Sequence, residues 1–267
     1  MDWIDYLDKR VIEEKTKRDE ERAKTYPEFC HHPSQSSALV DGKLHGKCLR
    51  ASFYQWTKVP KSNPIDAGGI WKQNIGDMIH ERIQGIFLSG PFEGIEKEKR
   101  VDIKNPALEY PIIGSIDLYS EKLKMGLEIK TTYGAGMTSP FGIKALGPKM
   151  EHRLQAICYM AMTGINQWFY IYFARDNAYR CQLAEEWNEK CQELWKGIIE
   201  RWKALEAFLK INELPPRDYK VILNEKGEMQ DTAQRGKEKF RSDWQCSYCD
   251  WKAHCWKDAK PEEGKKI

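Results

Sequence analysis

The hydrophobic positions along the chain recur with one period that is typical of helices and another that is typical of strands. Apolar residues three or four positions apart predict helices over residues 67–87, 147–164 and 185–209, and a shorter helix at "CLRASFYQW". Residues 1–25 carry many charges and a thin apolar stripe, which favours a helix packed on the surface of a domain. The prolines of "ELPPR" end the last long helix.

Strand-like segments lie between these helices. Apolar runs predict strands over residues 95–104, 110–119 and 125–133, and the polar "SEKLK" suits a hairpin loop between the last two. Two more strands are expected about a turn within residues 167–183. No internal repeat is visible.

Charged residues interrupt two of these apolar strands. Side chains alternate along a strand, so Glu128 and Lys130 share one face while Leu127 and Ile129 share the other. Asp117 ends the preceding apolar run. Buried charges are costly unless they are paired or bind a metal, and two adjacent carboxylates repel each other without a cation between them. A hard divalent cation such as Mg²⁺ or Mn²⁺ suits oxygen ligands of this kind. In a chain with 31% charged residues, however, the pattern alone is a weak signal.

Residues of two predicted helices could complete such a site. His80 lies among isoleucines and could supply a nitrogen ligand, although a lone histidine there is more often a hydrogen-bonded, partly buried side chain. Gln155 and Tyr159 are four residues apart and therefore share a helix face. Taken alone, they are more often ordinary packing residues.

The overall composition restricts the function less than the motifs do. A formal net charge of +3 among 83 charged residues permits nucleic-acid binding without indicating it. The longest apolar run, residues 168–174, is too short to span a membrane, and the charged N-terminus lacks the apolar segment of a secretory signal. We therefore expect a cytoplasmic protein without a membrane partner.

Cysteines give the sharper signal. Cys246, Cys249 and Cys255 in "CSYCDWKAHC" have C-x2-C-x5-C spacing, which suits metal binding in a reducing compartment. Zinc and iron–sulfur sites both prefer four ligands, so a remote fourth cysteine is expected. Cys48 is favoured over Cys30 because it directly precedes a predicted helix. The spacing leaves zinc and iron–sulfur equally open.

In their order, these residues resemble a known family. The series from Cys48 and His80 through "GSID", "EIK" and "QAICY" to "CSYC" resembles the RecB-like PD-(D/E)xK nucleases over about residues 46–256. The similarity is to the iron–sulfur branch that includes CRISPR-associated adaptation exonucleases, phage relatives and helicase-linked nuclease domains. Ile116 replaces the nominal proline before the aspartate. No Walker-A loop is present, so any motor would be a separate chain.

The resemblance implies an α/β fold, with a restriction-endonuclease-like mixed central sheet flanked by helices. It implies that His80, Asp117, Glu128 and the Ile129 carbonyl bind Mg²⁺ or Mn²⁺, that Lys130 is the catalytic lysine, and that Gln155 and Tyr159 lie near the DNA. A [4Fe–4S] cluster that joins the two ends of the chain would be held by Cys48, Cys246, Cys249 and Cys255.

These implications lead to a functional expectation. We expect a charged helical extension (1–45), a nuclease domain (46–260) with an iron–sulfur region formed by Cys48 and residues 244–256, and a disordered tail (261–267). The expected activity is exonucleolytic hydrolysis of DNA, with single strands favoured by analogy. The alternatives are a structure-specific DNA endonuclease and a non-catalytic iron–sulfur or zinc DNA-binding adaptor. Recombination, replication or CRISPR-adaptation proteins are the expected partners besides DNA.

Overall fold

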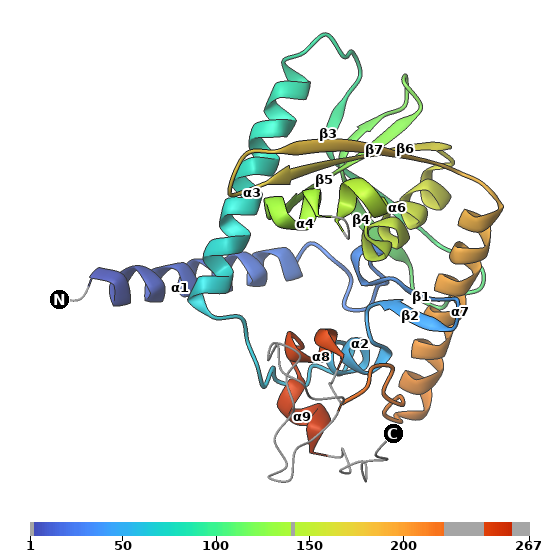
Figure 1. Cartoon of the computed structure of the whole chain (residues 1–267). Helices are drawn as coiled ribbons and strands as arrows, with labels where there is room; N and C mark the ends of the chain where they lie inside the picture. Colours follow the sequence, from blue (N-terminus) through green and yellow to red (C-terminus); the bar gives the residue numbers. More distant parts are fainter. Residues whose placement is uncertain (1–2, 140–141, 222–242, 258–267) are drawn as a thin grey trace. The chain divides into compact units, whose positions relative to one another are not determined.

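The structure is a computed structural model that describes residues 3–139, 142–221 and 243–257 (Figure 1). The chain forms two compact units, each built from separated stretches. The first unit comprises Met1–Gly46 and Asp66–Lys203, and the second comprises Lys47–Ile65 and Ala204–Ile267. These two units are not the segments that were expected from the sequence, which were divided at residues 45 and 260. The expected division into an extension, a nuclease domain and a tail stays a prediction. The expected disordered tail, 261–267, lies outside the described residues.

The first unit contains a five-stranded mixed sheet in the order β3-β4-β5-β6-β7. All five strands predicted from the sequence are present. Neighbouring strands run antiparallel except β5 and β6, which run parallel. The bounds are β3 (Glu96–Ile103), β4 (Ile112–Ser120), β5 (Met125–Thr132), β6 (Gln167–Ala174) and β7 (Arg180–Glu186).

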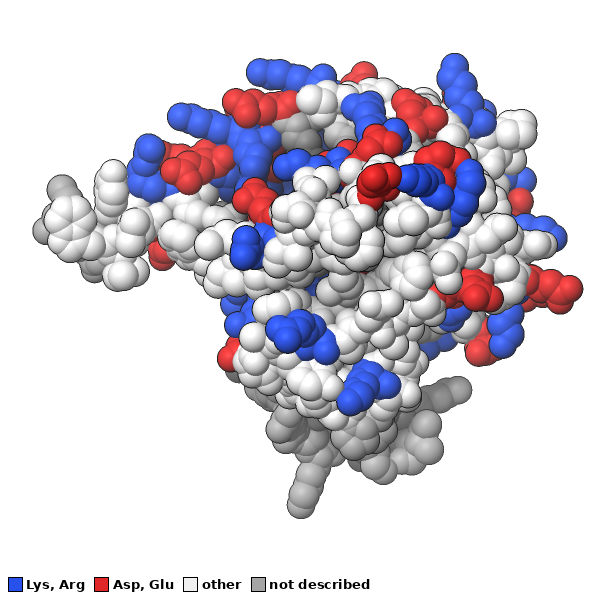
Figure 2. Space-filling model, turned by 90° about the horizontal axis from the view of Figure 1, so that it is seen from above, with Lys and Arg blue, Asp and Glu red and all other residues white. Residues whose placement is uncertain are grey.

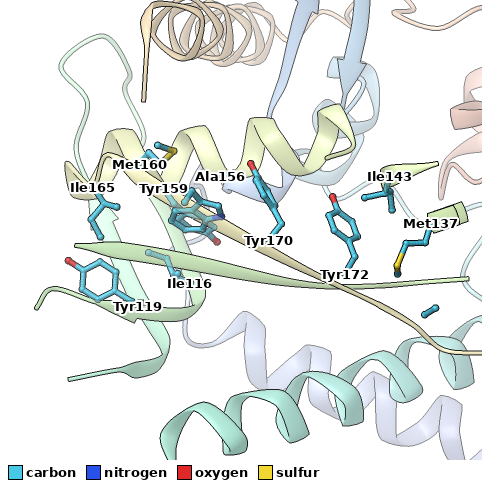
Figure 3. Close-up of a cluster of buried hydrophobic side chains, with 12 residues drawn as sticks. Ile116, Tyr119, Met137, Ile143, Ala156, Tyr159, Met160, Ile165, Tyr170 and Tyr172 are labelled. Atoms are coloured by element: carbon cyan, nitrogen blue, oxygen red, sulfur yellow. The ribbon is translucent and has the colours of Figure 1, made fainter. Parts of the chain in front are cut away.

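Helices cover both faces of this sheet because β6 is apolar on both sides. Trp168, Tyr170 and Tyr172 are fully buried in a cluster with side chains of α6 (Met150–Thr163). Figure 3 shows this cluster, with Tyr170 and Tyr172 labelled. The alternate residues Phe169 and Ile171 pack in a second cluster with side chains of α3 (Ala67–Leu88). The helices predicted over 147–164 and 67–87 are therefore the two layers that enclose the sheet. Fully buried strands of this kind are typical of α/β proteins.

Two predicted helices differ in detail from the expectation. The helix expected from residue 185 is α7 (Glu189–Ile211), which begins later because residues 185 and 186 still belong to β7. The N-terminal helix is α1 (Trp3–Ala23). Its apolar stripe is largely exposed, with Trp3 67% and Leu7 46% exposed, and only Val11 is buried. Polar contacts join α1 to α3: Trp71 Nε1 donates to Asp8 at 3.1 Å, and Arg18 pairs with Asp77 at 3.2 Å.

Several short elements were not expected. The turn-rich segment after residue 30 contains a 3₁₀ turn (Pro33–Gln35) and an antiparallel hairpin of β1 (Ser37–Val40) and β2 (Lys43–Gly46). Two brief helices, α4 (Gly134–Thr138) and α5 (Ile143–Leu146), follow β5. Four or five residues are too few to show a periodic pattern in the sequence.

The second unit contains the helix that follows Cys48, as predicted. Among the described residues, the helices that lie wholly in this unit are α2 (Leu49–Trp56), α8 (Trp244–Ser247) and α9 (Lys252–Trp256), and the end of α7 belongs to it from Ala204 on. Trp251 is buried and donates its indole N–H to the Val59 carbonyl at 2.8 Å, and Asn63 N donates to the Asp250 carbonyl at 2.8 Å. These bonds fasten the Cys-rich segment to the chain that follows α2. Within the described part of the chain, no helix combines the length and the apolar character needed to cross a membrane.

Candidate active site

The separation of β4 from β5 positions the two acidic residues. The backbones of these strands pair only near their hairpin, from Ser120 and Met125 to Leu118 and Leu127, whereas β5 pairs with β6 along its whole length. The next residues in register are Asp117 and Glu128. Asp117 Oδ2 accepts a hydrogen bond from Ile129 N at 2.7 Å, so a side chain takes the place of a ladder bond where the strands part.

Lys130 lies beside Glu128, as strand alternation predicts. Lys130 Nζ donates to Glu128 Oε1 at 2.5 Å and to Gln155 Oε1 at 3.1 Å, and Gln155 Nε2 donates to Glu128 Oε1 at 3.0 Å. Two of these bonds hold one oxygen of the Glu128 carboxylate, and the third joins the two donors to each other. The other oxygen, Oε2, is buried and has no hydrogen-bond partner among the described residues. A buried acceptor left unsatisfied is costly, and a bound cation would satisfy it.

His80 also reaches this group from α3. Its Nδ1 lies 3.6 Å from Asp117 Oδ2, and the imidazole is 28% exposed. Burial and the nearby Lys130 ammonium lower the pKa of His80. A neutral imidazole at physiological pH is the form that can bind a metal ion.

The electrostatics show an excess of negative charge. Burial, followed by the charge of Asp117, raises the pKa of Glu128 to about 7 despite its ion pair with Lys130. Burial likewise raises the pKa of Asp117 to about 6, opposed by Lys130 and the Ile129 N–H. Burial lowers the pKa of Lys130, but the charges of Glu128 and Asp117 outweigh burial, so its pKa is raised overall. One lysine therefore does not neutralise two carboxylates, and the site favours an additional positive charge.

Tyr159 supports the site from the core. Its side chain is fully buried and stacks on Trp168, with ring centroids 5.6 Å apart, and its hydroxyl donates to the Ser115 carbonyl at 2.6 Å. A Cβ atom at Gly114 would lie 2.8 Å from the Tyr159 ring, so this glycine allows β4 to approach α6 closely. Tyr159 thus fixes the strand that carries Asp117, while Gln155 contacts the charged group directly.

One nearby acidic residue was not identified from the sequence. Glu98 lies on β3 opposite Asp117, because its neighbours Lys97 and Lys99 pair with Leu118 and Ile116. Gln84 Nε2 donates both to Glu98 Oε1 at 2.7 Å and to the Asp117 carbonyl at 3.0 Å.

The backbone of Glu98 has a φ of +50°, which is uncommon for a residue other than glycine and is often found at functional sites. The charge of Glu98 raises the pKa of Asp117 and of His80. Nothing in the segment "EKEKR" distinguishes Glu98 from its charged neighbours, so the sequence held no signal for it.

The four predicted cysteine ligands all lie in the second unit. Cys48 caps the N-terminus of α2, where burial and the charge of Asp218 raise its pKa to about 11. Burial raises the pKa of Cys246 to about 12, with further contributions from the thiolate charges of Cys48, Cys255 and Cys249. Cys246 is therefore close enough to the other three thiols to respond to their charges. Cys30 belongs to the first unit, where burial and the charge of Asp102 raise the pKa of its thiol.

Neither the charged group around Asp117 and Glu128 nor the four cysteines are arranged as a complete metal site among the described residues. Among residues 3–139, 142–221 and 243–257, no group of three or more His, Cys, Asp or Glu side chains is arranged to hold a metal ion. The donor chemistry still fits the expected groups. Glu128 Oε2 lacks a partner, and the Asp117 carboxylate raises the pKa of Glu128, which a cation would reverse. Cys246 and the three thiols whose charges act on it are the kind of sulfur donors that zinc and iron–sulfur clusters require.

Comparison with known proteins gives weak structural likeness only. No protein-family model and no curated protein matches the chain. The structure is similar to SSO0001 over 92% of both chains, with 14% identity and a TM-score of 0.49. It is also similar to the alkaline exonuclease LHK-Exo from Laribacter hongkongensis in complex with dAMP, with 18% identity, a TM-score of 0.45, and coverage of 61% of this chain and 80% of that one.

A phage-related exonuclease from Haemophilus somnus 129PT has 16% identity and a TM-score of 0.43, over 61% of this chain and 81% of the other. At these values the likeness does not assign the chain to a family.

Proposed function

We propose that this chain is a divalent-metal-dependent deoxyribonuclease of the PD-(D/E)xK type. The observation that carries the proposal is the charged group where β4 and β5 part: two carboxylates with raised pKa values, one of them with an unsatisfied oxygen, beside a protonated lysine. A purely structural ion pair would satisfy both oxygens of a buried carboxylate. Clustered groups with perturbed pKa values at an opening in a sheet are typical of catalytic sites.

Asp117, Glu128 Oε2, His80 and the Ile129 carbonyl would hold the cation, Mg²⁺ or Mn²⁺. Such an ion polarises a phosphoryl oxygen and lowers the pKa of a bound water molecule. The chain itself keeps these ligands in place, because Asp117 is fixed by Ile129 N and Glu128 by Gln155 and Lys130.

Lys130 would act as a positively charged group and not as a general base. Its raised pKa keeps the ammonium protonated at neutral pH. From its position beside Glu128, the ammonium can orient the attacking water or stabilise negative charge that develops on the phosphate. Gln155 is a positioning residue, since it bonds both Lys130 and Glu128, and Tyr159 positions β4.

The finer assignment is to an exonuclease that acts on single-stranded DNA in the cytoplasm. Partners would be proteins of DNA recombination, replication or CRISPR adaptation. In the second unit, Cys48, Cys246, Cys249 and Cys255 would hold a [4Fe–4S] cluster with a structural role. This cluster supplies no step of hydrolysis.

Serine at any of the four proposed cluster ligands should bleach the protein. Anaerobically purified wild type is expected to be brown and to contain iron and sulfide. Each of Cys48→Ser, Cys246→Ser, Cys249→Ser and Cys255→Ser should lose visible absorption and thermal stability, because metal binding is coupled to folding. Cys30→Ser is the matched control and should keep its colour. Colourless, zinc-containing protein would overturn the iron–sulfur assignment. Loss of colour in Cys30→Ser, with colour retained in Cys48→Ser, would show that Cys30 is the fourth ligand in place of Cys48.

Substrate topology tests the proposed activity. With Mn²⁺, wild type should degrade end-labelled linear single-stranded DNA and leave covalently closed circles of the same sequence intact, because an exonuclease needs a free end. Chelator should stop the reaction. Cleavage of the circles would show an endonuclease instead. An inert, metal-replete protein that still binds DNA would be an adaptor.

A further inference from the structure

Charge alone does not mark a DNA-binding surface on the face drawn in Figure 2. Lys and Arg side chains are mixed with Asp and Glu on the face drawn in Figure 2, in keeping with a net charge of only +3 for the whole chain.

A cavity of about 670 Å³ opens directly beside the candidate active site. Its walls come from α1, from α3, from the end of β5 and from the residue that follows β6. The lining includes Lys15, Arg18, Lys72, His80, Lys130 and Arg175. Because His80 and Lys130 belong to the candidate active site, a molecule in the cavity would also contact that site.

The cavity concentrates positive charge. Five lysines and arginines line it against two aspartates, Asp19 and Asp77. Both aspartates already have cationic partners, Lys15 for Asp19 and Arg18 for Asp77. Lys130 is paired with Glu128 of the candidate active site. The excess positive charge therefore comes from Lys72 and Arg175, and it suits a polyanionic ligand.

Arg175 is held in place but not fully satisfied. Its Nη1 donates to the Lys72 carbonyl at 3.0 Å, and its guanidinium lies 4.8 Å from the centre of the Tyr133 ring. Its Nε is buried and has no hydrogen-bond partner among the described residues. A guanidinium oriented by an aromatic ring with a free N–H is well suited to a phosphate oxygen.

Tyr133 adds a surface for a base. Its side chain is 50% exposed although Arg175 covers part of the ring. Bases of single-stranded DNA stack on such exposed aromatic rings, whereas bases within a duplex are not accessible for stacking. The cavity volume is also in the range of pockets for small ligands, which suits one or two nucleotides and not a paired duplex.

We propose that this cavity binds the sugar–phosphate backbone of a single DNA strand next to the bond that is cleaved. Arg175 and Lys72 contact phosphates, Tyr133 stacks on a base, and α1 forms one wall of the binding site. The N-terminal helix is then part of the substrate site and more than a surface helix. The inference rests on the proposed function, because it takes the strand in the cavity to be the substrate.

Binding of a labelled single-stranded oligonucleotide in chelator tests the proposal without cleavage. The double variant Lys72→Gln/Arg175→Gln removes two phosphate contacts. It should weaken binding on the order of tenfold at about 0.1 M salt and lower the slope of log K against log salt by about 1.4. Tyr133→Ala should weaken binding but leave the slope of log K against log salt unchanged, because no phosphate contact is removed.

The matched control is Lys190→Gln/Lys196→Gln, which removes the same charge from exposed positions on α7 outside the cavity. It should bind like the wild type, and melting curves should show that all variants fold. Arg175→Lys, which keeps the charge but not the planar fork, should lose affinity and keep most of the salt slope.

An equal loss in the α7 control, or an unchanged slope in the cavity variant, would overturn the proposal. So would wild-type binding of duplex DNA as tight as that of a single strand. Failure of the proposed nuclease function would give a different result: the wild type would bind DNA normally but would not cleave it in Mn²⁺.

Discussion

Alanine in place of Lys130 is expected to reduce Mn²⁺-dependent DNA cleavage by about a hundredfold to a thousandfold, a loss typical of removing one group that stabilises transition-state charge. Affinity for Mn²⁺ should stay the same or increase. The Lys130 ammonium lowers the pKa values of Asp117 and Glu128, and a group that disfavours protons on these carboxylates also disfavours a cation. Initial cleavage rates and isothermal titration calorimetry measure the two effects.

Controls separate chemistry from folding in this experiment. Lys130→Gln keeps a polar side chain of similar length and should also be inactive, because the positive charge is what matters. Lys104→Ala removes an exposed lysine outside the cavity and should be fully active. The proposed role of Lys130 would be wrong if a folded Lys130→Ala protein lost Mn²⁺ affinity or cleaved DNA at the wild-type rate.

Asparagine at Asp117 is expected to stabilise the protein in chelator and to abolish cleavage. Asp117 titrates at about 6 in the folded chain, compared with an ordinary value of 3.8. A raised pKa means that the folded state binds the proton more tightly. The raised pKa of Asp117 therefore lowers the stability of the folded state as pH rises from 3.8 to about 6. The full cost is present above the folded pKa. The cost amounts to at most about 3 kcal/mol at about pH 8.

Asparagine removes that cost and keeps an oxygen that can accept the Ile129 N–H. In chelator at about pH 8, Asp117→Asn should melt higher than the parent, by about 2 to 4 °C for each kcal/mol gained. The gain should vanish below pH 3.8, where the parent carboxyl becomes protonated in the unfolded as well as in the folded state. Added Mn²⁺ should stabilise the variant less than the parent, because a ligand is missing. The colour of the cysteine-bound cluster should persist.

Asp176→Asn is the matched control for these melts. Asp176 Oδ1 accepts a backbone hydrogen bond from Gly134 N at 2.8 Å, but Asp176 is exposed, whereas Asp117 is largely buried. Its replacement should have little effect in chelator or in Mn²⁺. A variant Asp117→Asn that melts well below the parent in chelator at about pH 8 would show that Asp117 is a structural residue.

Local periodicity was sufficient to predict much of the fold and part of the site. The five strands and the two covering helices follow from long apolar patterns, and strand alternation placed Glu128 and Lys130 on one face. Helical spacing placed Gln155 and Tyr159 on one face, but it could not show that Gln155 contacts Glu128 while Tyr159 bonds the Ser115 carbonyl.

Features that depend on contacts between distant segments were not predictable. The parting of β4 from β5 is a property of strand pairing, and no single strand encodes it. Glu98 faces Asp117 only because of the β3–β4 register. Arg175 follows β6 and lines the cavity with residues of α1 and α3, which are about 100 residues or more away in sequence. The apolar stripe of α1 was expected to be packed, yet only Val11 is buried, because polar side chains make the contacts with α3.

The central claim is that the Asp117, Glu128 and Lys130 group hydrolyses DNA with a divalent cation. The most direct measurement is the release of nucleotides from linear single-stranded DNA by anaerobically purified wild type, Asp117→Asn and Lys130→Ala, each in Mn²⁺ and in chelator. We expect release by the wild type in Mn²⁺, release by Lys130→Ala in Mn²⁺ that is about a hundredfold to a thousandfold slower, and none by Asp117→Asn or in chelator, with all three proteins folded. Release by either variant at the wild-type rate, or none by a wild type that binds Mn²⁺, would contradict the claim.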